Sequence, residues 1–186
     1  VSRAEVTDNT FVMVIGCGMV GLGAVMRASL RGAIVIAADI DDEKLALAKE
    51  AGATYAVNTM TEDVHQRIQE ITGGYGADVV IEAVGSPATY VMAVNEVGFT
   101  GRVVCIGYAK SEVAFQTKLF VQKELDIRGS RNATPSDFRA VINCINTGRY
   151  PIEKFISKVV TPEETPDAMK DWSENPGKIF RILVEF

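Results

Sequence analysis

The chain has 186 residues, 47% hydrophobic and 23% charged, a composition typical of a globular domain. Its formal net charge is −5 and it contains no run of Lys or Arg. This argues against a nucleic-acid partner, because proteins that bind nucleic acids carry basic patches. The three cysteines, Cys17, Cys105 and Cys144, are too far apart for a zinc-ligand spacing or a disulfide framework. We therefore expect a reducing, cytoplasmic setting.

Residues 11–26 carry no charge, yet we expect no membrane span there. The stretch is shorter than the roughly 18 residues that a spanning helix needs, and four glycines interrupt it. Residues 1–10 are mixed and polar, so we expect no secretory leader in this stretch either.

Six short apolar runs predict buried β-strands. They cover residues 11–15, 34–39, 55–57, 78–82, 102–106 and 125–128. Continuous apolar runs are typical of a parallel sheet that is covered on both faces. Strands that alternate with helices at this spacing predict right-handed βαβ units. The expected fold class is α/β, a doubly wound parallel six-stranded sheet of the Rossmann type.

Helix boundaries between these strands follow from capping residues and glycines. The expected stops and caps are Gly32 after the first helix, Asp42 before the second, Thr59 with Glu62 as a capping box before the third, and Ser86 with Pro87 before the fourth.

The pattern changes after Arg131. A helix is expected from Thr134 to Gly148 and another over residues 166–173, and the closing segment 178–186 has the composition of a strand. These elements are too few to build a core alone, so we divide the chain into residues 1–131 and 132–186.

The strongest motif is GCGMVG at residues 16–21, a G-x-G-x-x-G pattern between the first strand and the first helix. Its first glycine allows a tight turn, the second lets a pyrophosphate approach the backbone, and the third lets helix and strand pack closely. A phosphate would meet the N–H groups at the positive end of the helix. The alternative is a glycine-rich turn without a ligand. The residues that we expect at the phosphates are Gly16, Gly18, Met19, Val20 and Gly21.

An acidic residue, Asp39, ends the second strand. A carboxylate there can accept hydrogen bonds from the adenosine-ribose hydroxyls and would repel a 2′-phosphate. Ile40 is suited to pack on adenine. The motif and the acid together predict a dinucleotide site that prefers NAD to NADP.

The carboxyl ends of the fourth and fifth strands should form the floor under the second nucleotide, because open parallel sheets bind ligands there. The residues concerned are Ala83, Val84, Gly85, Ile106 and Gly107. Ordinary core and turn positions are the alternative for each.

We expect no catalytic residue and no metal ligand in the chain. The single histidine, His65, falls on a helix face, and no Ser-His-Asp set or metal cluster can be assembled.

The segments VMVIGCGMVGLGAV, ADIDDEKLALAKEAGA, DVVIEAVGS, GRVVCIGYA, ELDIRGSRN and KIFRILVEF occur in this order. With this order and spacing, residues 9–186 resemble the C-terminal half of the medium-chain, zinc-type alcohol dehydrogenases, which include sorbitol and threonine dehydrogenases. The resemblance implies that 1–131 is the NAD(P)-binding domain. It also implies that 132–186 returns to a catalytic domain whose remainder is absent.

The resemblance also implies site residues and partners. Lys44 would lie near the adenosine ribose, and Arg181 near the pyrophosphate. Positions lining the nicotinamide pocket would be Val84, Ile106, Gly107, Ser130 and Asn132. The edge strand from Leu125 to Ser130 would pair with its copy in a homodimer. The family's catalytic zinc ligands lie upstream of its cofactor domain, so zinc is expected only in the full-length enzyme.

The favoured function is therefore the cofactor-binding fragment of an NAD-dependent, zinc-dependent alcohol or polyol dehydrogenase, inactive in isolation. Two alternatives stay open. One is a zinc-free quinone or enoyl reductase of the same superfamily, and the other is a non-catalytic NAD-sensing domain.

Overall fold

A computed structural model describes residues 1–148, 152–175 and 179–186. The chain divides into two compact units, residues 1–133 and 134–186. None of the helices within the described residues has the length and hydropathy that crossing a membrane requires.

The first unit is built on one parallel sheet with the strand order β3-β2-β1-β4-β5-β6. Its strands are β1 (Phe11–Ile15), β2 (Ile34–Asp39), β3 (Tyr55–Asn58), β4 (Ala77–Glu82), β5 (Val97–Cys105) and β6 (Asp126–Gly129). All neighbouring strands pair in parallel. This order is that of the Rossmann fold, and it confirms the predicted doubly wound, six-stranded α/β architecture.

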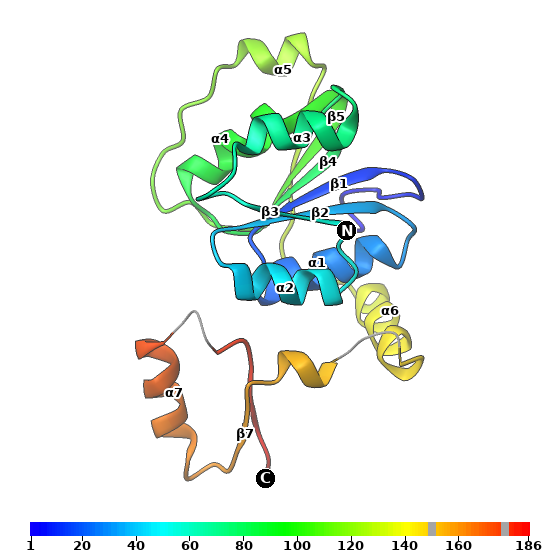
Figure 1. Cartoon of the computed structure of the whole chain (residues 1–186). Coiled ribbons are helices and arrows are strands. Elements are labelled where there is room, and N and C mark those ends of the chain that lie inside the picture. Colours follow the sequence, from blue (N-terminus) through cyan, green and yellow to red (C-terminus); the bar gives the residue numbers. More distant parts are fainter. Residues whose placement is uncertain (149–151, 176–178) are drawn as a thin grey trace. The chain divides into compact units, whose positions relative to one another are not determined.

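Helices cover both faces of this sheet (Figure 1). They are α1 (Met19–Ser29), α2 (Asp42–Glu50), α3 (Val64–Thr72), α4 (Pro87–Glu96) and the short α5 (Lys118–Gln122). One core face joins Met13 and Ile36 of the sheet to Ile68 of α3 and Ala93 of α4. The strands are continuous apolar runs because both of their faces are buried.

The helix caps differ in part from the predicted ones. Ser86 caps α4, as predicted, and the structure adds a full capping box, with Thr89 as its partner side chain. The cap of α2 is Asp41 rather than Asp42, and its carboxylate accepts from the N–H groups of Glu43 and Lys44.

The predicted capping box at α3 is wrong. Asp63 caps this helix, and its carboxylate accepts from the N–H of Gln66. Glu62 instead accepts a 2.7 Å hydrogen bond from the N–H of Asn58, so the predicted partner of Thr59 serves the end of β3. The first helix also ends at Ser29, before the predicted stop at Gly32.

The second unit contains α6 (Pro135–Asn146), a 3₁₀ turn (Ile152–Phe155), β7 (Lys158–Val160), α7 (Thr165–Glu174) and β8 (Ile182–Val184). Thr134 caps α6 in a capping box. The predicted closing strand is realised as β8, while Lys178 lies outside the described residues. β8 pairs in parallel with β7, a strand that the sequence analysis did not predict.

Candidate functional site

A cleft of about 520 Å³ lies at the carboxyl ends of β1, β2 and β4. The strand order reverses between β1 and β4, which is where open parallel sheets bind ligands. Seven of the predicted site residues line the cleft: Gly16, Gly18, Asp39, Ile40, Lys44, Ala83 and Val84.

Two glycines of the glycine-rich turn are closely approached by neighbouring atoms. Gly16 has φ +94°, and a Cβ there would lie 2.6 Å from a methyl of Val84. A Cβ on Gly21 would lie 1.7 Å from the carbonyl oxygen of Gly16. At Gly18 nothing lies within 4 Å of the Cβ position, so this residue leaves open space beside the start of α1. Gly16 and Gly21 therefore allow close contacts within the turn, and Gly18 leaves space that a ligand can enter.

The start of α1 has no side-chain cap. Gly18 occupies the N-cap position, and the first turn carries no acidic residue. The N–H groups at this end carry the positive end of the helix dipole. An anion placed in the open space beside Gly18 would meet them.

Asp39 is fixed by three backbone N–H groups. Its Oδ2 accepts from Cys17 at 2.6 Å, and its Oδ1 accepts from Ile40 at 2.8 Å and from Asp41 at 3.1 Å. An ionised carboxylate has about four acceptor positions, so it can still accept from a ligand hydroxyl. The contact with Cys17 also links the acid directly to the glycine-rich turn.

Two exposed apolar side chains flank the cleft. Ile40 is 65% exposed and Val84 is 52% exposed. They lie after β2 and β4, on the two sides of the switch in strand order. Flat apolar groups of a ligand would find a packing partner at each end of the cleft.

The floor after β4 depends on Glu82, which the sequence analysis did not single out. This fully buried side chain accepts through Oε1 from the N–H groups of Val84 (2.9 Å) and Gly85 (2.8 Å) and from the Thr89 hydroxyl (2.8 Å). Its Oε2 has no hydrogen-bond partner in the described part of the chain. Glu82 therefore shapes the turn at residues 83–85.

Two predicted floor residues pack against that turn from β5. A Cβ on Gly107 would lie 2.2 Å from the N of Gly85 and 2.7 Å from Oε2 of Glu82. The N–H of Ile106 donates to the Glu82 carbonyl at 2.8 Å. The Tyr90 hydroxyl donates to the Gly107 carbonyl at 2.6 Å, which ties α4 to the same floor.

The remaining predicted residues do not line the cleft. Met19, Val20 and Gly21 form the first turn of α1, and Val20 is 57% exposed. Ser130 and Asn132 follow β6, where the Ser130 N–H donates to Cys105. Arg181 belongs to the second unit, so the geometry of the first unit does not test its place at the pyrophosphate.

Seven lining residues were not predicted as site residues: Ile15, Ala38, Thr59, Ser86, Ala88, Thr89 and Met92. Ile15 and Ala38 belong to the ends of β1 and β2, and Thr59 directly follows β3. The other four belong to the cap and first turns of α4. The Ser-Pro signal located the start of α4, but it did not tell which side chains would turn toward the cleft.

Neither the thiol beside the site nor its acidic residues suggest more than ligand binding. Burial raises the pKa of the Cys17 thiol to about 12, so this residue stays neutral. Among the described residues, no group of three His, Cys, Asp or Glu side chains could hold a metal ion.

The family model for zinc-binding dehydrogenases matches residues 19–147. The chain belongs to this family. It is 33% identical over 184 residues to an uncharacterised zinc-type alcohol dehydrogenase-like protein from Haemophilus influenzae, covering 99% of this chain and 54% of that protein. It is 35% identical over 156 residues to the erythritol/L-threitol dehydrogenase of Mycolicibacterium smegmatis, covering 83% of this chain and 43% of the relative.

Solved structures agree with this membership. An alcohol dehydrogenase from Escherichia coli in complex with NADH superposes with a TM-score of 0.89 and 27% identity, covering 100% of this chain and 55% of that one. The chain therefore spans about half the length of the proteins that it matches. The resemblance to zinc-type alcohol dehydrogenases, and to their C-terminal half, is confirmed.

Proposed function

We propose that this chain is the NAD-binding part of a zinc-dependent dehydrogenase that oxidises a secondary alcohol or a polyol. The family is that of alcohol and polyol dehydrogenases, and a relative at 35% identity acts on erythritol and L-threitol. In that role NAD would accept a hydride from the alcohol carbon. The residues of this chain would bind and orient the cofactor.

The observation that carries the proposal is the position of Asp39 beside the uncapped start of α1. Three backbone N–H groups hold its carboxylate at the end of β2. From there it would accept from the ribose hydroxyls, while the open space at Gly18 would admit the pyrophosphate. Asp39 favours NAD because it would repel a 2′-phosphate. Ile40 and Val84 would pack on the adenine and nicotinamide rings.

Cofactor titration tests this proposal. We expect NADH to bind about tenfold to a hundredfold more tightly than NADPH, since a hydrogen bond to a charged group contributes roughly 1.5–3 kcal/mol. Asp39→Ser should shrink that ratio. Gly18→Ala should weaken both cofactors while leaving the thermal transition unchanged. The control is Gly23→Ala in the same helix, where a Cβ also meets nothing within 4 Å. Equal or tighter NADPH binding would overturn the proposal and favour a quinone or enoyl reductase.

The zinc that the family name implies does not fit the described residues, which offer no ligand set. We place its ligands in a part of the enzyme that this chain does not span. The chain alone should hold no stoichiometric zinc and should not oxidise alcohols. Metal analysis and the absorbance of reduced cofactor measure both. One zinc per chain, or sustained turnover, would contradict this assignment.

We further propose that β6 pairs with its copy in a homodimer. β6 is an edge strand, and Ser130 donates its N–H inward to Cys105. Because N–H directions alternate along an extended strand, the N–H of Ile127 points outward. A second copy would use it in a two-fold contact. Ile127→Pro removes this donor and should yield monomers in light scattering, whereas Ile127→Thr keeps it and should still dimerise. A monomeric wild type would refute the pairing.

A further inference from the structure

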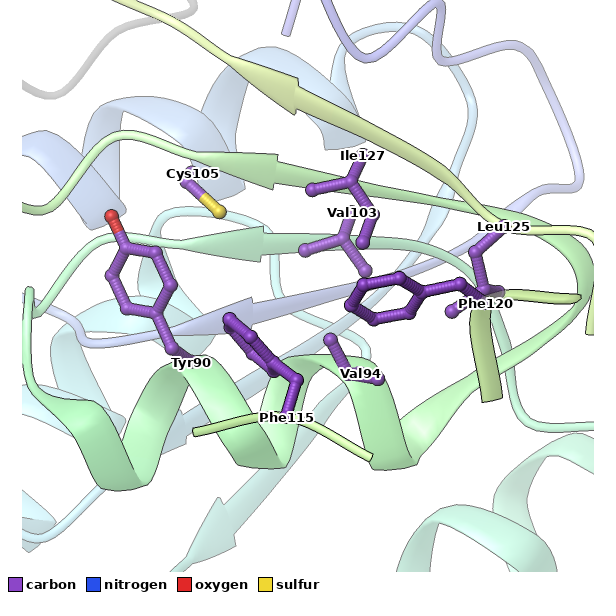
Figure 2. Close-up of a pocket in the computed structure, with 8 residues that line it drawn as sticks. All are labelled: Tyr90, Val94, Val103, Cys105, Phe115, Phe120, Leu125 and Ile127. Atoms are coloured by element: carbon purple, nitrogen blue, oxygen red, sulfur yellow. The ribbon is translucent and has the colours of Figure 1, made fainter. Parts of the chain in front are cut away.

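A second cavity, of about 420 Å³, lies in the first unit between α4 and the strands β5 and β6 (Figure 2). Its walls come from Val94 of α4, Val103 and Cys105 of β5, and Ile127 of β6. The volume falls within the range of small-molecule sites, roughly 300–1,000 Å³. It is also well above the roughly 150 Å³ of an apolar cavity that stays dry and binds benzene.

Aromatic rings set the shape of this cavity. Phe115 and Phe120 line it with their ring centroids 5.7 Å apart and their planes tilted by 56°. Figure 2 shows both rings between α4 and the strands, with the ring of Tyr90 at one end. Aromatic pairs prefer tilted or offset contacts, so a further flat ring packs well against such a wall. The Cys105 sulfur points toward the same space and suits contact with a ring edge.

The lining carries no charged partner for a ligand. No Asp, Glu, Lys, Arg or His lines the cavity. The two ionisable groups present, Tyr90 and Cys105, have pKa values raised by burial, so both are neutral at physiological pH. A charged ligand would lose its hydration there without compensation.

We propose that this cavity is a binding site for a small, uncharged aromatic molecule of one or two rings, separate from the dinucleotide cleft. Tyr90 joins the two regions, because its ring lines the cavity and its hydroxyl donates to the Gly107 carbonyl at 2.6 Å. An occupant that shifts this ring would shift the floor of the cleft.

Indole is a suitable probe, and its binding can be measured by calorimetry and by ligand-observed NMR. We expect one indole per chain, and no binding of indole-3-carboxylate, which adds a negative charge to the same rings. Val94→Phe on α4 and Ile127→Phe on β6 fill the cavity from opposite walls. Each should weaken indole binding about tenfold or more. Val121→Phe is the matched control, because Val121 is 80% exposed and lies outside the lining.

The thiol offers a second measurement that does not depend on substitutions. Cys105 lines the cavity, so indole should slow its reaction with an uncharged maleimide while leaving Cys144 unaffected. Peptide mass spectrometry distinguishes the two. Failure of indole to bind, or binding that survives both filling variants, would overturn the proposal. If Val94→Phe, which is on α4 and not on the edge strand β6, instead changes the oligomeric state seen by light scattering, a second copy of the chain fills the cavity and the ligand site is wrong.

The link to the cleft rests on the proposed function and is tested separately. NADH affinity is measured first alone, which tests the dinucleotide site. It is then measured with saturating indole, and coupling must be reciprocal. We expect a change in the wild type that Tyr90→Phe abolishes, since Phe keeps the ring but loses the bond to Gly107. An unchanged NADH affinity would disprove the link, whatever the outcome for indole.

Discussion

The two units of the chain each contain an amphipathic helix, but only the first unit buries the apolar face of its helix. In the first unit, α3 buries Ile68 completely against the sheet. In the second unit, α6 is about as amphipathic as α3, but none of its residues is buried. Its side chains Phe138, Val141 and Ile142 are 63%, 45% and 52% exposed. Among the described residues of that unit, the buried apolar side chains are Phe155, Ala168 and Ile179.

This difference shows what an amphipathic pattern does and does not predict. The pattern identifies the face of a helix that will be buried, but not the surface that buries it. In the first unit the sheet supplies that surface. In the second unit the described two-stranded sheet, β7 with β8, is too small to do so.

Separating the units should give the largest effect. A chain of residues 1–133 should unfold cooperatively and keep its circular dichroism, because the six-stranded core lies entirely within it. A chain of residues 134–186 should show no cooperative thermal transition, since so small an apolar core cannot offset the loss of chain entropy. A sharp transition for residues 134–186 would break the comparison.

A pair of isoleucines measures the difference at single positions. Ile68→Ala should lower the free energy of unfolding by about 2–5 kcal/mol, the usual cost of emptying a buried isoleucine site. Ile142→Ala, at a half-exposed position of α6, should change it by no more than about 0.5 kcal/mol. Urea denaturation of both variants measures these values. Similar costs at both positions would mean that α6 is buried in solution.

Two glycines of α1 should show a smaller difference in the free energy of unfolding when each is replaced by alanine. A Cβ on Gly21 would overlap the Gly16 carbonyl, so Gly21→Ala should cost about 1–3 kcal/mol. Gly23 lies two residues later in the same helix with open space around its Cβ position. Gly23→Ala should therefore stabilise the protein by about 0.5–1 kcal/mol, because alanine favours the helix. Equal effects in denaturation curves would show that the close approach at Gly21 is absent in solution.

The sequence predicted the elements of the first unit well, because both local signals and burial favoured the same structure. The run at residues 11–15 is β1 without change, and Asp39 ends β2 as expected. Elements with few residues were missed, notably α5 and β7. Their short segments carry too little periodicity to be recognised. At α3, Glu62 accepts a local hydrogen bond from the N–H of Asn58, four residues before it, and Asp63 caps the helix instead.

Site residues could be predicted from the sequence where the backbone geometry requires a particular residue type. Residues that reach the site through side-chain contacts were harder to predict. Gly16 and Gly21 are required by contacts that a Cβ would prevent, and such positions leave a clear signal. Glu82 left none. In the sequence, a glutamate at the end of an apolar run indicates only where the strand ends. The folded chain shows that Glu82 accepts hydrogen bonds from three donors in the turn and in α4. Thr89 and Met92 were not predicted as cleft residues for a similar reason. The rotation of α4 about its axis decides which of its side chains face the cleft, and the sequence alone does not give this rotation.

The smallest effect concerns pH and contrasts one carboxylate in each unit. Glu96, buried at the end of α4, has its pKa raised by burial, although His65 and Lys123 act in the opposite direction. Asp171 in the second unit has its pKa lowered, chiefly by its hydrogen bond to Lys158.

A raised folded-state pKa means that the contribution of Glu96 to stability is fully present below about pH 4.5. It is lost as the pH rises through the folded-state value. Glu96→Gln removes this loss, so the variant should gain stability relative to wild type between pH 4.5 and 7.

Asp171→Asn should show the opposite trend, because a carboxylate with a lowered pKa stabilises the fold only above its pKa in the unfolded chain. Its effect should be near the detection limit, since both partners of that ion pair are about 40% exposed. Denaturation midpoints at several pH values measure both slopes. A Glu96→Gln variant that loses stability toward pH 7 would show that the interactions of Glu96 with His65 and Lys123 outweigh its burial.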